Sequence, residues 1–161
     1  MGQIGVIGPA DPSPEEYEIA RTVGRLIAGH HEMLVCGGLD GVMEAACKGA
    51  KEQDGLTIGI VPDTSNGNGF LDIVIRTGLG YARNVLIAQS SDAVIAIGGS
   101  YGTLSEIAIA LKTKRQVFGI KPWDIEGVMK CVTPKEAVLR AMSAAHQFSL
   151  YRSPQACPGS P

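Results

Sequence analysis

A glycine-rich turn between an apolar run and a helical pattern carries the strongest chemical signal in the sequence. The run Ala93–Ile97 is short and β-branched, which is typical of a buried parallel strand. Helically spaced apolar residues begin at Leu104. Between these two segments lie Gly98, Gly99, Ser100, Tyr101, Gly102 and Thr103. A strand, a glycine turn and a helix start present unpaired N–H groups and the positive end of the helix dipole. The turn is therefore predicted to bind phosphate.

Two residues at the start of this helix allow a second interpretation. The segment Thr103-Leu104-Ser105-Glu106 fits a capping box, in which Thr103 caps the helix and Glu106 reaches back. In the other interpretation, Glu106 is a general acid or base. The spacing alone leaves both roles open.

A second glycine turn follows the apolar segment at 33–35. It comprises Gly37, Gly38, Leu39, Asp40 and Gly41, and Gly8 ends the first apolar segment in the same way. Because the carboxyl ends of parallel strands meet at one edge of a sheet, we expect the three turns to converge on one cleft.

Arg83 follows the glycine-spaced segment 78–80, close to the start of another helical pattern. A cation there is unfavourable to the helix dipole, so a phosphate or carboxylate partner is expected. The alternative is an ordinary solvated arginine. Asn84, its neighbour, is included in the candidate binding site.

The elements that must position these residues are strands and helices in alternation. Ser13–Glu16 and Thr133–Glu136 both have the cap, proline and glutamate that begin helices. Strands are predicted over 3–7, 33–35, 56–61, 73–75, 93–97 and 116–120, with the last helix reaching His146. This alternation predicts an α/β fold of three layers, α/β/α, with a mainly parallel, doubly wound sheet.

The length of 161 residues suits a single domain, which we place at 1–150. We expect the Pro/Ser/Gly-rich tail over 151–161 to fray. The segment 63–69 has turn chemistry throughout, and we expect it to be mobile.

Composition argues against several classes of partner. The formal net charge of −2 gives no electrostatic reason to expect nucleic acid or an acidic membrane surface. No apolar run is long enough for a membrane span and the N-terminus lacks signal-peptide features, so a cytoplasmic location is predicted. The four cysteines show no CxxC spacing. Cys36 and Cys47 fit buried, reduced thiols, and we expect no metal site.

Three ordered motifs resemble the lonely-guy (LOG) superfamily, once labelled "possible lysine decarboxylase". They are GGLDGVMEAACKGA at 37–50, TGLGYARN at 77–84 and GGSYGTLSEIAIALK at 98–112. The resemblance runs from Ile4 to about Trp123. It implies a Rossmann-like fold and, for the enzymes of the superfamily, hydrolysis of the N-glycosidic bond of cytokinin nucleoside 5′-monophosphates. The catalytic arginine and glutamate of those enzymes would be Arg83 and Glu106, and Gly102-Thr103 would match their phosphate-binding pair.

The sequence departs from the enzymes at two places. Gly98-Gly99-Ser100 stands where they carry Pro-Gly-Gly, and Ala82-Arg83-Asn84 stands where they carry Glu-Arg-Lys. The combination is more similar to a sister subfamily that includes the molybdenum cofactor carrier proteins, with TGxGxARN and a tryptophan after the next strand. Trp123 fits that tryptophan, although ordinary partial burial is an equal interpretation.

Two functions follow. The first is binding of a phosphorylated ligand that carries a ring, by a carrier or sensor that requires no cofactor of its own. The ligand would be a nucleotide or the pterin phosphate of the molybdenum cofactor, with Tyr101 or Trp123 against the ring. The second is a LOG-type nucleoside 5′-monophosphate phosphoribohydrolase; a lysine decarboxylase is not expected. Arginine and glutamate favour the enzyme, and the altered neighbours of Arg83 favour binding.

The resemblance also implies self-association, because members of the superfamily form dimers or larger assemblies. The apolar helical segments Ala82–Ile87 and Ile107–Leu111 look richer than one sheet face requires. We therefore expect a homodimer or homotetramer with a two-fold interface built on helices. A small phosphorylated molecule is the other expected partner.

Overall fold

The computed structural model describes residues 1–152 and has an α/β fold with one parallel sheet. The elements are β1 (Gln3–Ile7), α1 (Pro14–Gly29), β2 (Met33–Cys36), α2 (Val42–Lys51), β3 (Thr57–Val61), β4 (Ile73–Arg76), the 3-10 helix η1 (Gly80–Arg83), α3 (Asn84–Ser90), β5 (Ala93–Ile97), α4 (Tyr101–Lys112), β6 (Gln116–Ile120), β7 (Val128–Cys131) and α5 (Pro134–Arg152). Within this range, seven strands pair in the order β4-β3-β2-β1-β5-β6-β7, all in parallel.

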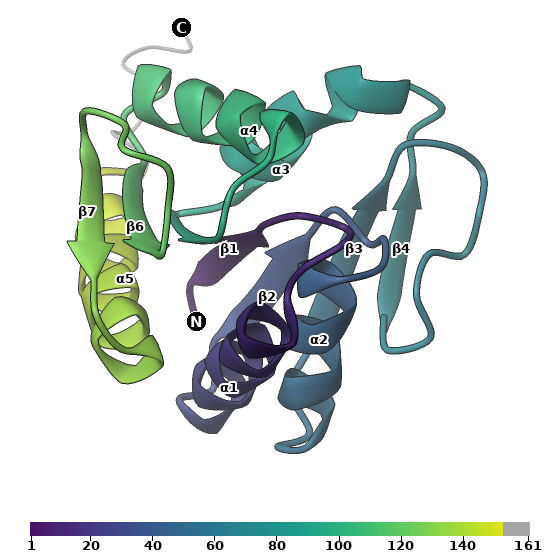
Figure 1. Cartoon of the computed structure of the whole chain (residues 1–161), viewed down its shortest axis with the longest axis horizontal. Helices are drawn as coiled ribbons and strands as arrows, with labels where there is room; N and C mark the ends of the chain where they lie inside the picture. Colours follow the sequence, from purple (N-terminus) through teal and green to yellow (C-terminus); the bar gives the residue numbers. More distant parts are fainter. Residues whose placement is uncertain (153–161) are drawn as a thin grey trace, which may run out of the picture.

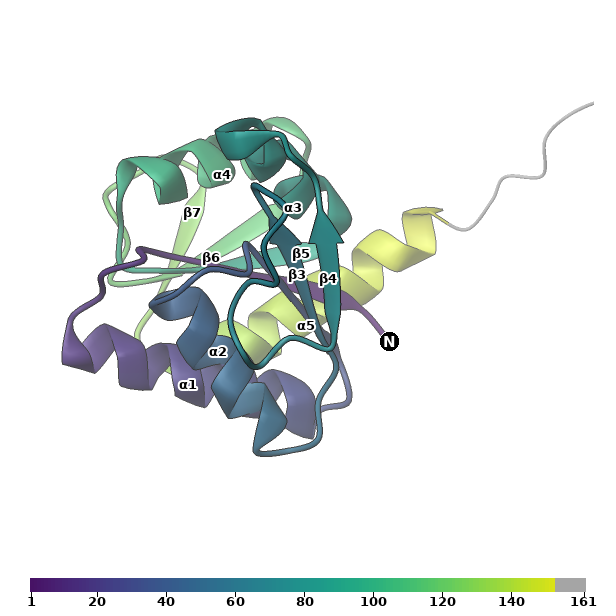
Figure 2. The same ribbon diagram turned by 90° about the vertical axis from the view of Figure 1, so that its right-hand side faces the viewer.

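Helices cover both faces of the sheet, as the alternation of elements predicts (Figures 1 and 2). Helices α1, α2 and α5 share one face, and α3 and α4 lie on the other. The central strand β5 is buried at every position because it is covered from both sides. The three-layer, doubly wound fold expected from the sequence is confirmed.

The strand order reverses between β1 and β5. From β1 the chain winds outward to β4, then returns to β5 on the other side of β1 and winds outward to β7. Ligands of such sheets bind beyond the carboxyl ends of the strands at this reversal. The turns after β1 and β5 meet there.

Local sequence signals explain most of the boundaries. Ser13 and Glu16 form the predicted capping box of α1: the Ser13 side chain accepts from Glu16 N at 3.2 Å, and the Glu16 carboxylate accepts from Ser13 N at 2.8 Å. Strand β7 was not predicted, because its four residues, Val-Met-Lys-Cys, form neither an apolar run nor an alternating pattern.

The carboxyl-terminal end differs from expectation in one respect. Helix α5 continues to Arg152, beyond the His146 predicted from the sequence. The rest of the expected tail, 153–161, lies outside the described residues. No helix within the described range is long and apolar enough to cross a bilayer.

Helices α1 and α2 approach each other backbone to backbone. A Cβ on Gly24 of α1 would lie 1.8 Å from the carbonyl oxygen of Ala46 in α2. A Cβ on Gly49 of α2 would lie 1.8 Å from the carbonyl oxygen of Arg21 in α1. Because both obstacles are backbone atoms, a side chain at either position forces the helices apart.

We predict that Gly24→Ala lowers the free energy of unfolding by about 1–3 kcal/mol, although alanine is the better helix former by about 1 kcal/mol. Urea denaturation would measure the loss. Gly29→Ala is the matched control, because Gly29 ends the same helix and a Cβ there meets nothing within 4 Å. A Gly24→Ala protein as stable as the control would contradict the close helix contact.

Candidate functional site

An open cleft lies at the carboxyl ends of β1, β2 and β5. Its volume is about 140 Å³, and its lining residues are Gly8, Ala10, Leu39, Met43, Tyr81, Arg83, Asn84, Ser100, Gly102, Thr103 and Glu106. Ligand pockets for whole small molecules usually measure about 300–1,000 Å³. A cleft of this size has room for part of such a molecule and not for the whole.

Other hollows in the described part of the chain lack the buried ion pair of Arg83 and Glu106: one is lined by the buried Glu32, whose Oε1 lies 2.8 Å from His146 Nε2. A larger one, of about 340 Å³, is lined by Arg25, Leu26, Gly29, His30 and Gln53. It lies at the end of α1, where Arg25 and His30 are exposed to water. By volume alone, that hollow would be the candidate site. We choose the cleft because it contains the buried, ionisable side chains of Arg83 and Glu106.

The turn after β5 brings the start of α4 into the cleft. Ser100 caps this helix: its side chain accepts a hydrogen bond from Thr103 N at 3.3 Å and lies 3.0 Å from the Thr103 hydroxyl. The amide of Gly98 donates to Ile120 O at 3.0 Å. The amides of residues 99–102 make no hydrogen bond within the described part of the chain. The predicted row of unpaired N–H groups is therefore present, but it excludes Gly98 and Thr103.

Of the two interpretations of Glu106, the capping box with Thr103 is excluded. Helix α4 begins at Tyr101, with Ser100 as its cap, so Glu106 lies in the second turn and not at the third position. Ser100 already satisfies the amide that the box would cap. Glu106 instead faces Arg83.

Arg83 ends η1 and is buried, so the alternative of a solvated surface arginine is excluded. Its Nη1 lies 3.0 Å from Asn84 Oδ1, to which it donates, and 3.6 Å from Glu106 Oε1. The side chains of Arg83 and Glu106 are only 7% and 8% exposed. The Nε–H of Arg83 is buried without a partner among the described residues. Buried donors without a partner are rare in folded proteins, so we expect the Nε–H to donate to an acceptor outside the described residues.

Burial controls the ionisation of this pair. It raises the pKa of Glu106 to about 7, although the positive charge of Arg83 acts in the opposite direction. Burial also lowers the pKa of Arg83, against the attraction of Glu106. A carboxyl group that titrates near neutral pH can give or take a proton under physiological conditions.

Two helices hold the pair in place through side-chain hydrogen bonds. Asn84 opens α3, and its Nδ2 donates to Ser105 Oγ of α4 at 2.8 Å. Ser105 in turn donates to Gly102 O at 2.7 Å. Asn84 therefore links Arg83 on one helix to the α4 turn on the other. The sequence marked Asn84 as a site residue but gave no signal for Ser105.

The turn after β2 packs beneath Arg83. A Cβ on Gly37 would lie 2.6 Å and 2.7 Å from the two terminal guanidinium nitrogens, so glycine there makes room for Arg83. Gly41 serves a packing role: with φ of +70°, it lies against the carbonyl oxygens of Pro9 and Ala10. The following predicted site residues do not line the cleft: Gly37, Gly38, Gly41, Gly98, Gly99 and Tyr101.

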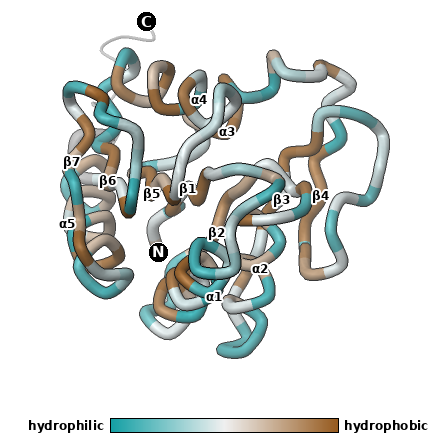
Figure 3. Tube along the Cα trace, viewed as in Figure 1, coloured by the Kyte–Doolittle hydropathy of each residue, from teal (hydrophilic) through white to brown (hydrophobic). Residues whose placement is uncertain are grey.

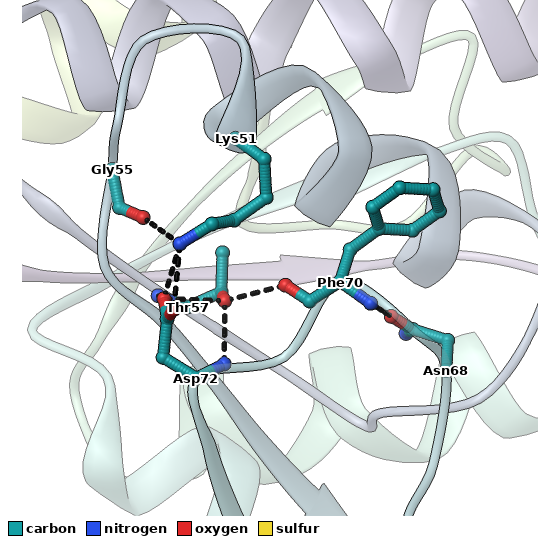
Figure 4. Close-up of polar contacts among 6 residues, drawn as sticks. All are labelled: Lys51, Gly55, Thr57, Asn68, Phe70 and Asp72. Carbon is teal, nitrogen blue, oxygen red and sulfur yellow. Dashed lines mark hydrogen bonds and ion pairs between the residues drawn. The ribbon is translucent and has the colours of Figure 1, made fainter.

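The segment 63–69 is tied to this turn by hydrogen bonds. Asn68 N donates to Gly38 O at 2.9 Å, and Asn68 Nδ2 donates to Leu39 O at 3.0 Å. Figure 4 shows how the base of the segment is anchored: the Asp72 carboxylate contacts Lys51 Nζ at 2.6 Å and accepts from Thr57 N at 2.9 Å. The segment thus braces one wall of the cleft.

Sequence reasoning missed four lining residues: Ala10, Leu39, Met43 and Tyr81. Leu39, Met43 and Tyr81 lie within the ordered motifs, which was the signal that could have identified them. The exposed Tyr81 forms one rim of the cleft. Beyond the α4 turn, Trp123 packs against Gly99 and meets Tyr101 edge to face, with 5.5 Å between ring centroids.

Two cysteines that are distant in the sequence meet behind the cleft. The Sγ atoms of Cys36 and Cys47 lie 3.5 Å apart, and both are buried free thiols, as predicted. The hydrogen bond from Cys47 lowers the pKa of Cys36, and the same contact raises the pKa of Cys47. Among the described residues, no cluster of three or more His, Cys, Asp or Glu side chains could hold a metal ion.

Comparison with known proteins gives consistent matches along the chain. The model of the SLOG cluster4 family matches residues 1–154. A protein of Archaeoglobus fulgidus is 51% identical over 145 residues, which span 89% of this chain and 96% of that relative.

Solved structures of other proteins also match most of the chain. The molybdenum cofactor binding protein from the phototrophic bacterium Rippkaea orientalis is 39% identical over 88% of this chain and 96% of its own, with a TM-score of 0.83. The Moco carrier protein from Chlamydomonas reinhardtii is 34% identical over 91% of this chain and 98% of its own, also with a TM-score of 0.83. DNA processing protein A from Helicobacter pylori, at 20% identity and a TM-score of 0.70, shares the fold alone.

We predict that the stability of the protein depends on pH, because the carboxyl group of Glu106 is buried. Because the pKa of Glu106 is raised from 4.5 to about 7 on folding, its contribution to stability is full below about pH 4.5 and is lost as the pH rises to about 7. We expect Glu106→Gln to abolish this loss, which amounts to roughly 3 kcal/mol at about 1.4 kcal/mol for each pKa unit.

Urea denaturation between about pH 5 and pH 8 would measure the free energy of unfolding of both proteins. Glu126→Gln is the control, since Glu126 is exposed. Parallel pH profiles for wild type and Glu106→Gln would contradict a titrating, buried Glu106.

Proposed function

Because the chain belongs to the SLOG cluster4 family, we propose that it binds a phosphorylated ligand that carries a ring, as a carrier or sensor. The proposal rests on two observations within the described residues: the amides of 99–102 are unpaired, and the buried Nε–H of Arg83 has no hydrogen-bond partner. Amides at a helix start and an arginine are the groups that proteins use for phosphate.

The pterin phosphate of the molybdenum cofactor is the leading candidate ligand. It is supported by the resemblance of this chain to proteins that bind or carry that cofactor. In this proposal, the phosphate would lie against the start of α4 and the ring would extend over the rim, beside Tyr81 or the Tyr101–Trp123 pair. The cofactor is cargo in this proposal, and the protein requires none of its own.

A nucleoside 5′-monophosphate phosphoribohydrolase is the second candidate, and one observation favours it. Arg83 and Glu106 face each other in the cleft, and the pKa of Glu106, about 7, suits a general acid or base. Against it stands Asn84, where the resembling enzymes carry lysine. Asn84 is neutral, so it adds no charge to the cleft. Its amide group is hydrogen-bonded to Arg83 and Ser105.

We expect Arg83→Ala to weaken the binding of AMP about ten- to a hundredfold, because a hydrogen bond to a charged group contributes about 1.5–3 kcal/mol. Isothermal titration calorimetry with AMP and with inorganic phosphate would measure it. Arg25→Ala is the control, as Arg25 is exposed at the end of α1. Equal affinities for wild type and Arg83→Ala would refute the assigned anion site.

The same samples separate the two candidates. A carrier releases no adenine from AMP, whereas release at an enzymatic rate would establish the hydrolase. In that case Glu106→Gln should lower the rate by about two to four orders of magnitude and leave AMP binding nearly intact. Mass spectrometry of small molecules that copurify with the wild type would identify the ligand.

Self-association remains a proposal. The exposed apolar side chains indicate an interface at the edge strand β4 instead of on the helices. Ile107 of α4 and Ile87 of α3 are buried in the core, so these helices have fewer apolar side chains to spare than the sequence suggested. Ile73 and Ile75 of β4 are each 45% exposed and Leu79 is 53% exposed, at the hydrophobic edge strand seen in Figure 3.

We expect a homodimer or homotetramer at micromolar concentration, with β4 and the adjoining residues in a two-fold interface. Light scattering would measure the mass, and Ile75→Lys should reduce it. A monomeric wild type would contradict this proposal. The cytoplasmic location likewise remains a prediction.

A further inference from the structure

The Arg83–Glu106 pair has incomplete hydrogen bonding. The 3.6 Å between Arg83 Nη1 and Glu106 Oε1 is longer than a hydrogen bond. Neither carboxylate oxygen of Glu106 accepts a hydrogen bond from the described residues, and the Nε–H of Arg83 is also without a partner there. Buried charges in stable ion pairs are normally fully hydrogen-bonded. This pair is therefore open to a third group.

Few charged or titratable groups face Glu106. They are Arg83 and Tyr81 from η1, and Cys36 from β2 with Cys47 from α2 behind it. Glu16 of α1 lies against Gly98 and does not line the cleft. The β1 turn contributes Gly8 and Ala10, and α3 contributes Asn84, none of which carries charge. Arg83 is thus the one cation at hand for either Glu106 or a ligand within the described cleft.

An anion in the cleft competes directly with the Glu106 carboxylate. The unpaired amides of Ser100 and Gly102 and the Nε–H of Arg83 attract the anion, but Glu106 lines the same cleft. Two like charges in a buried space repel strongly, and such sites respond by binding a proton on one of them. A protonated Glu106 also becomes a donor that can bond to a ligand oxygen.

We propose that the cleft binds its anionic ligand together with one proton, taken from solvent by Glu106, so that the ligand is held at lower pH and released as the pH rises. This inference rests on the proposed function of the cleft as an anion site. The step is a proton transfer: a hydronium ion of the solvent gives up a proton, an O–H bond forms on the Glu106 carboxylate, and Arg83 turns from Glu106 to the ligand.

The direction of the pH effect follows from linkage. Without ligand the pKa of Glu106 is about 7, and a bound anion raises this pKa further. Below about pH 7 the carboxyl is already protonated, so affinity changes little. Above it the ligand must bring a proton, and the dissociation constant should rise by up to about tenfold per pH unit.

Inorganic sulfate is the probe of choice, because its charge does not change in this range. Binding can be followed through the fluorescence of Trp123, the single tryptophan of the chain, which packs against Gly99 of the α4 turn. Dissociation constants would be measured from about pH 6 to about pH 8.5 for wild type, Glu106→Gln and the exposed control Glu126→Gln. Calorimetry in buffers of different ionisation enthalpy would count the protons taken up.

We expect the wild type and Glu126→Gln to bind sulfate about tenfold or more weakly at the upper end of this range, with uptake of up to about one proton. Glu106→Gln mimics the protonated residue, so it should bind at every pH as the wild type does at low pH, without proton uptake. Because glutamine matches glutamate in shape, we expect the variant to fold. The calorimetric count of protons is made on the wild type, so it does not depend on any variant.

Two results would overturn the inference alone: sulfate affinity of the wild type that is independent of pH, or a pH dependence that persists in Glu106→Gln. The second result would assign the proton to another group. Failure of sulfate and AMP to bind either protein at low pH would instead remove the proposed function, and this inference with it.

Discussion

A cation and a carboxyl group buried together at the strand-order reversal set the constraints on the cleft. Removing Arg83 and Glu106 from water is unfavourable, and their mutual attraction at 3.6 Å offsets only part of that. The surroundings supply the rest: Asn84 accepts from Arg83, and glycine at position 37 leaves space for the guanidinium. A buried pair that the protein satisfies incompletely contributes little to stability, which favours a functional role.

The glycines around the cleft perform different physical tasks, although the sequence suggests one task for all. Gly37 admits Arg83, Gly41 admits the backbone of the β1 turn, and Gly99 admits the indole of Trp123. Gly24 and Gly49 let α1 and α2 touch on the far side of the fold. In the turn after β5, the amides of residues 99–102 make no hydrogen bond within the described residues, whereas those of Gly98 and Thr103 do. Glycine content alone therefore does not locate a phosphate site; the hydrogen-bond partners of each amide do.

Local patterns made the fold predictable, and long-range contacts made parts of the site unpredictable. Short apolar runs located six strands, three of them followed by glycine turns, and the Ser13–Glu16 box located the first helix, because these signals lie within a few residues. The start of α4 was misplaced because Ser100 and Thr103 are both good caps, and only the fold decides between them. The contacts of Cys36 with Cys47, and of Asn68 with Leu39, join distant segments that no local pattern connects.

The shape of the cleft bears on the choice between carrier and hydrolase. A glycosidic bond is cleaved in a site that surrounds the sugar, excludes bulk water and positions one water for attack. Here the cleft is small and open, and Tyr81 at its rim is 92% exposed. A ligand anchored by its phosphate would keep its ring accessible to another protein. A single chain with this geometry is better suited to holding and handing on a ligand than to enclosing one for reaction.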